Sequence, residues 1–181
     1  MCRIFTHTDD PMGATVEIKL SRIEKLVKAL QNGAVAGFHV GVVDGGTNGI
    51  TGVSIATYAA YNEFGTSTIP PRPFLGLSAK KHGKKWADIV AAGLKGIGQS
   101  ADPEKVLHDA MMGAGRIATG DVQEMIKSNI QPDNAPRYKR YKERLRSEKR
   151  GGGYSGTLVL SGDMLNAINV QLVDAHGNMT P

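Results

Sequence analysis

The stretch PFLGLSAKKHGKKWADIVAAGLKGI, residues 73–97, decides the fold class, because its pattern is that of one long helix. Pro73 stands in the first turn, where a helix tolerates proline best, and the segment 80–85 is a polar interruption. The apolar residues recur largely at i, i+3, i+4 and i+7 steps and are Phe74, Leu77, Trp86, Ile89, Val90, Leu94 and Ile97. This spacing predicts a long helix that lays one face on a sheet.

Segments that alternate apolar with polar residues predict the strands of that sheet. They are 16–20, 38–42 and 168–172, with 50–55 as the return strand of a hairpin and 157–160 as extended chain. The glycine-rich segment 44–49 tolerates positive φ, as a hairpin or a longer loop requires. We therefore expect an α+β fold, in which a small antiparallel sheet of about four strands packs against one long helix and two or three shorter helices, with long exposed loops.

Local signals place the shorter helices. Ser21 and Glu24 have the spacing of a capping box and predict a helix over 21–31. The segment 57–64 has a helical pattern that Gly65 ends, and a short helix is expected within 161–167.

A second long helical stretch begins at Asp102, a capping residue, followed by a proline in the first turn. Inside it, Gly113, Gly115 and Gly120 cost about 3 kcal/mol together relative to alanine. Two explanations are open: another backbone approaches closely there, or the helix breaks, in which case the break falls before Asp121.

Length and composition indicate one domain. The chain has 181 residues, 40% of them apolar and 22% charged, which is enough to bury a continuous core. We expect a flexible N-terminal extension over 1–13, a single α+β domain over 14–173 with a basic loop at 131–155, and a flexible tail over 174–181. The single cysteine, Cys2, excludes an intramolecular disulfide, and the chain has no apolar run long enough for a membrane span and no signal-peptide pattern. A soluble protein made in the cytoplasm is the expectation.

The net charge of +5 comes from one segment, 137–150. This segment holds eight cationic and two acidic residues, a net charge of +6. The other 14 basic and 15 acidic residues of the chain sum to −1. We expect a loop with a transient helix over 138–147, and three roles are open: a solvated loop, a contact with an acidic protein surface, or a contact with nucleic acid through cations and stacking tyrosines. The candidate contact residues are Arg137, Tyr138, Lys139, Arg140, Tyr141, Lys142, Arg144, Arg146, Lys149 and Arg150.

No segment carries a recognisable catalytic pattern. The glycines at 46, 49 and 52 lack the spacing of a dinucleotide-binding loop, and Gly83-Lys84 lacks the flanking residues of a phosphate loop. The five histidines are scattered, so no metal-ligand spacing emerges. We expect a protein that is not an enzyme, with no catalytic residues, no cofactor, no metal and no small-molecule substrate.

Two motifs resemble a known family. Residues 58–66, YAAYNEFGT, followed by 69–75, IPPRPFL, are similar to the signature of the tail-completion and neck proteins of tailed bacteriophages, which act in head–tail joining and virion morphogenesis. Residues 160–168, LSGDMLNAI, resemble the closing element of that family, with Ser161 in place of the usual threonine.

The resemblance implies a structural virion protein made in the host bacterial cytoplasm. Its copies would form a homo-oligomeric ring, a hexamer, at the head–tail joint or tail end of a phage or phage-derived tail. Its partners would be a portal or connector on one side and a tail terminator or tail tube on the other, with non-specific contact to packaged DNA also open and no membrane.

The interface candidates are Glu63, Phe64, Arg72, Phe74 and Leu75. For the two phenylalanines the alternative is core packing. For Arg72 the alternatives are a hydrogen bond within the subunit and a contact across the ring, because a buried guanidinium needs partners. The alternative function is that of a small nucleic-acid-binding assembly factor acting through 137–150.

Overall fold

The structure, a computed structural model, describes residues 24, 27–28, 31, 35–43, 45–148 and 156–180. Its elements are β1 (Val35–Val42), α2 (Ile55–Phe64), α3 (Phe74–Gly93), the 3-10 turn η1 (Ile97–Gln99), α4 (Pro103–Lys127), α5 (Pro136–Ser147), α6 (Asp163–Ala167) and β2 (Ile168–Asp174). The fold class is α+β. Within the described residues the sheet has two antiparallel strands, fewer than the expected four or so.

The two strands join segments from opposite ends of the chain. Phe38 pairs with Leu172, Val40 with Val170 and Val42 with Ile168, so that apolar residues of both strands share a face. The expected strand 16–20 lies outside the described residues. Of the helix expected over 21–31, the described positions 24, 27, 28 and 31 are helical.

Two expected strands do not form as strands, although the first segment does return antiparallel, with an isolated β-bridge between Thr47 and Ser54. At 50–55 the chain makes a turn, because the side chain of Asn48 accepts hydrogen bonds from the backbone N–H groups of Ile50 and Thr51, at 3.0 and 2.9 Å. Ile55 then begins α2. At 157–160 the chain turns instead of extending, and its apolar side chains enter the core.

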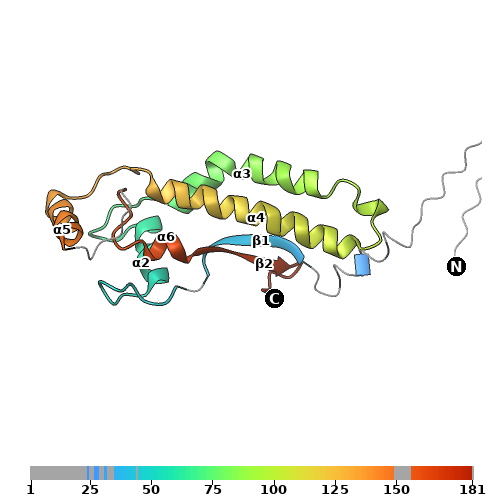
Figure 1. Cartoon of the computed structure of the whole chain (residues 1–181), viewed down its shortest axis with the longest axis horizontal. Coiled ribbons are helices and arrows are strands. Elements are labelled where there is room, and N and C mark those ends of the chain that lie inside the picture. The colour runs from blue at the N-terminus through green and yellow to red at the C-terminus, as the bar shows by residue number, and fades with distance from the viewer. Residues whose placement is uncertain are drawn as a thin grey trace, which may run out of the picture.

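Helices α3 and α4 form two layers over the sheet (Figure 1). Helix α4 lies across β1 and β2, and α3 packs on α4. The expectation that the long helix 73–97 rests on the sheet is therefore corrected: that place belongs to α4, and the helix ends earlier, at Gly93.

Helix α4 is continuous over 25 residues and does not break before Asp121. Asp102 caps it by accepting a hydrogen bond of 3.0 Å from the N–H of Lys105. A Cβ on Gly115 would overlap Val170 of β2 and lie 3.3 Å from Cδ2 of Phe38 in β1. The close approach of two side chains, and not of another backbone as expected, therefore explains the glycine at 115, while Gly113 and Gly120 have no such neighbour.

The main core lies where α2, α3, α4 and α6 converge, at the end of the molecule that also carries α5 (Figure 1). Its buried apolar residues are Ile55, Ala59, Phe74, Val122, Ile126, Ile130, Leu158, Val159, Met164, Leu165 and Ile168. Residues 174–180, expected to be a flexible tail, form a turn in which Asp174 accepts hydrogen bonds from the N–H groups of His176 and Asn178. Among the described helices, none has the length and apolarity to cross a membrane.

Candidate functional site

The motif over 58–75 comprises most of α2, the loop after it and the start of α3, and Glu63 joins the two helices. Its buried carboxylate accepts hydrogen bonds from the N–H groups of Leu75 (2.9 Å) and Gly76 (3.0 Å), in the first turn of α3. These N–H groups have no partner within their own helix and lie at its positive end, which favours an anion. Glu63 thus supplies from α2 the cap that α3 lacks locally.

Gly65 and Arg72 determine the path between the two helices. Gly65 has φ +77°, and a Cβ there would lie 3.0 Å from the carbonyl oxygen of Ile69, so a larger residue would be strained. Arg72 is buried, and its guanidinium donates to the carbonyl oxygens of Pro132 (2.7 Å) and Asp133 (3.1 Å). Of the two roles considered for Arg72, the structure places it in the hydrogen bond within the subunit.

The other interface candidates divide between core and surface. Phe74 is fully buried and Leu75 is half-buried. Phe64, the last residue of α2, is 81% exposed, and Tyr61 on the same helix is 44% exposed. Phe64 is therefore the interface candidate whose side chain a partner can reach.

The basic segment forms the helix α5 over Pro136–Ser147, close to the helix expected over 138–147, but as a packed element and not as a transient part of an exposed loop. Pro136 stands in its first turn, and Tyr138, Lys142 and Leu145 lie on one face at i, i+4 and i+7 steps. Leu145 is 1% exposed. Burying this face gives the helix the tertiary packing that its many cations do not supply.

Helix α5 is tied to the 58–75 unit through two tyrosines. The hydroxyl of Tyr58 donates to the carbonyl oxygen of Leu158 at 3.3 Å and interacts with the hydroxyl of Tyr138. Burial raises the pKa of both phenols, which keeps both hydroxyls protonated as donors. The motif that resembles the phage family and the basic segment thus form one structural unit.

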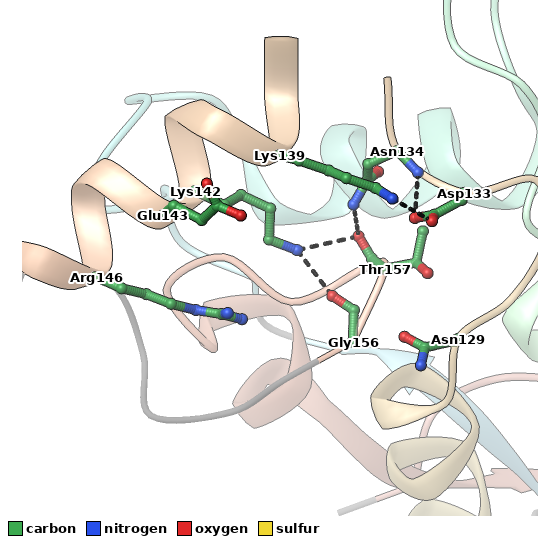
Figure 2. A pocket seen from close by; sticks show the side chains of 9 residues that line it. All are labelled: Asn129, Asp133, Asn134, Lys139, Lys142, Glu143, Arg146, Gly156 and Thr157. Carbon is green, nitrogen blue, oxygen red and sulfur yellow. Dashed lines mark hydrogen bonds and ion pairs between the residues drawn. The ribbon is translucent and has the colours of Figure 1, made fainter. Parts of the chain in front are cut away.

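Lys142 holds α5 against the loop that precedes α6 (Figure 2). Its buried ammonium donates to the carbonyl oxygens of Gly156 (2.7 Å) and Thr157 (3.3 Å). Burial, together with the nearby guanidinium groups of Arg146 and Arg72, lowers the pKa of Lys142 to about 8.

A polar pocket of about 200 Å³ lies beside Lys142 (Figure 2). Asn134, which lines it, donates to the carbonyl oxygen of Thr157 at 2.8 Å, and Lys139 pairs with Asp133. These interactions join α5, the segment before it and the loop 156–157. We interpret them as the attachment of α5 to the body.

The opposite face of α5 carries a row of exposed arginines, Arg137, Arg140 and Arg144, at i, i+3 and i+7. The guanidinium of Arg144 lies 5.5 Å from the ring centre of Tyr141 and its Nε is 3.8 Å from a carboxylate oxygen of Glu148. Lys149 and Arg150, two further candidates, lie outside the described residues. We call Arg137, Arg140 and Arg144 the outer arginine row.

The sequence did not reveal the roles of Tyr58, Asn134 and the buried Lys142, although the i, i+4, i+7 spacing of Tyr138, Lys142 and Leu145 indicated that these three share one face of a helix.

Within the described parts of the chain, no group of His, Cys, Asp and Glu side chains is placed to hold a metal ion. Comparisons of this chain with protein-family models, with curated proteins and with solved structures found no match.

Proposed function

We propose that this chain is a structural subunit of a tailed-phage virion or of a phage-derived tail. Its copies form a ring, a hexamer, at the head–tail joint or tail end, which completes the tail and connects it to the neck. The motifs at 58–75 and 160–168 motivate the proposal. Its partners are other copies of the chain, a portal or connector, and a tail terminator or tube protein.

The observation that carries the proposal is the exposed Phe64 in a fixed setting. Glu63 on one side is hydrogen-bonded to α3, and Gly65 on the other makes a turn that glycine permits. The phenyl ring is thus held outward by its neighbours, not left on a mobile loop. Burying a phenylalanine completely stabilises an assembly by about 2 kcal/mol, and a ring gains this once for each subunit.

A ring requires a heterologous contact, in which one surface of a subunit meets a different surface of the next. Phe64 and Tyr61 supply one such surface, at the end of α2. Arg72 and Tyr58 link the same 58–75 segment to the chain just before α5 and to Tyr138 of α5.

The experiment replaces Phe64 with serine and compares it with Met179→Ser, which alters another exposed apolar side chain, 69% exposed, far from α2 in the chain. Both variants should keep their stability to within about 0.5 kcal/mol, because surface substitutions rarely exceed this. Each gene is then used to complement a phage lacking this protein, and the particles are imaged by electron microscopy.

With Phe64→Ser we expect filled heads separate from finished tails, and with Met179→Ser joined particles. Native mass measurement of the purified variants in the presence of tail components should show a ring for wild type and Met179→Ser but not for Phe64→Ser. Normal particles from Phe64→Ser would refute the assigned contact, and normal infectious particles in the absence of the protein would refute the function.

A further inference from the structure

We propose that the outer arginine row of α5 binds the phosphate backbone of duplex DNA, independently of base sequence. The row consists of Arg137, Arg140 and Arg144, all exposed. This interaction adds a partner to the proposed function, on which it rests for the source of the DNA: the genome that passes through the head–tail joint.

The spacing of the row fits a strand of DNA. With a rise of about 1.5 Å per residue, seven residues of helix carry the arginines over about 10 Å. One strand of duplex DNA presents a phosphate about every 3.4 Å along the helix axis, so about three phosphates lie along this length. Because the strand winds around the axis, its phosphates are farther apart than this rise, and the long arginine side chains span the difference so that each guanidinium can reach one phosphate.

The row is presented rigidly because the opposite face of α5 is attached. Lys142 is hydrogen-bonded to two carbonyl groups and Leu145 is buried, so the helix has one rotational setting, with the arginines outward. Helix α5 lies at one end of the molecule, beyond the C-terminal end of α4 (Figure 1).

Charge favours a polyanion over another copy of this chain. Helix α5 with Glu148 carries six cations and two carboxylates, whereas the chain outside 137–150 sums to −1 with both signs interspersed. Each guanidinium also presents a planar set of donors that matches phosphate oxygens. The outer row carries no amide or apolar side chain that would read base edges, which predicts binding without sequence preference.

The test measures the affinity of the full chain for a 20-base-pair duplex, an arbitrary length of about two helical turns, by fluorescence anisotropy over a range of KCl concentrations. The variants are the triple substitution R137Q/R140Q/R144Q and the charge-preserving R137K/R140K/R144K. The matched control, K80Q/K81Q/K95Q, removes the same charge from exposed positions of α3 and the turn after it. Circular dichroism melting confirms that each variant is folded.

Each phosphate contact contributes about −0.9 to the slope of log K against log salt. For the glutamine variant we expect this slope to be less steep by about 2.7, because three contacts are removed. The lysine variant and the α3 control should have the same slope as the wild type. An unchanged slope in the glutamine variant, or an equal loss in the control, would overturn the proposal. Tighter binding to polyglutamate than to DNA, with the same arginine dependence, would also overturn it and assign the row to an acidic protein surface.

This assay is independent of ring formation, because it uses the free chain and DNA alone. Ring formation with tail components is measured without DNA. A failed arginine test with a successful Phe64 test would leave the proposed function intact, and the reverse pattern would leave the DNA contact intact.

Discussion

Gly115 of α4 is the position where one added methyl group tests the packing of the helix on the sheet. Replacing a helical glycine with alanine normally stabilises a helix by about 1 kcal/mol. At Gly115 the new Cβ would overlap Cγ2 of Val170. Rotating the Val170 side chain moves Cγ2 but leaves the Cβ of Val170 at 3.2 Å and Cδ2 of Phe38 at 3.3 Å, both tighter than an ordinary contact. Overpacking of a core costs about 3 kcal/mol at the upper end of its usual range. We expect Gly115→Ala to destabilise the protein by about 2 kcal/mol.

The same helix provides the controls. Gly113 and Gly120 have nothing within 4 Å of the place that an added methyl group would take, so their alanine variants should gain about 1 kcal/mol each. In a chain of this size, 1 kcal/mol moves Tm by about 2–4 °C. Thermal unfolding followed by circular dichroism should therefore show Tm lowered by about 4–8 °C for Gly115→Ala and raised for the other two.

A double substitution identifies the contact responsible. Val170→Ala makes room for the new methyl group, so Gly115→Ala combined with Val170→Ala should be less destabilised than the sum of the two single variants, by about 1–2 kcal/mol. If Gly115→Ala raises Tm as the control variants do, the close approach of α4 to the sheet is refuted, and so is the reason given for this glycine.

Three further predictions concern buried charged groups. Glu63→Ala removes the cap of α3 and should lower the free energy of unfolding by about 2 kcal/mol in urea; a change below about 0.5 kcal/mol would contradict that role. Arg72→Lys keeps the charge but not the two-carbonyl contact, so trypsin should cleave α5 faster under native conditions, and an unchanged cleavage rate would count against the tether. The pKa of Lys142 is about 8 in the folded state, below the usual 10.5. Between these two pH values the unfolded chain therefore binds more protons at this side chain than the folded chain does. The free energy of unfolding that this group contributes rises with pH over that range. Relative to Lys142→Met, the wild type should gain about 1.5 kcal/mol between pH 8 and about pH 9.5, and parallel pH profiles would refute this.

Helices whose ends are marked by capping or terminating residues could be predicted from the sequence. Asp102 with the proline after it marked the start of α4, and Gly65 marked the end of α2, because capping and helix termination depend on neighbours in the chain. The segment 50–55 was expected to be the return strand of a hairpin because glycines and Asn48 precede it. The Asn48 side chain instead holds a turn at 50–51, and the return is limited to the bridge between Thr47 and Ser54.

The sequence indicated which residues belong to the candidate site but not what each of them contacts. The segment 137–150 was recognised as basic, and the residues 63, 64, 72, 74 and 75 as exceptional, but not their separate roles. Glu63 and Arg72 have partners in other elements, 12 to 61 residues away, and such distances leave no periodic trace in a sequence.

The sequence by itself therefore determined the α+β class, most helices and the place of the excess charge, since these follow from local spacing and composition. Only the tertiary structure decided that α4 lies on the sheet, that Phe64 points outward, and that Lys142 and Arg140, two similar cations on one helix, face opposite ways. Lys142 meets the carbonyl groups of 156 and 157, and Arg140 meets solvent. The physical reason is that the role of a charge depends on which groups folding brings next to it.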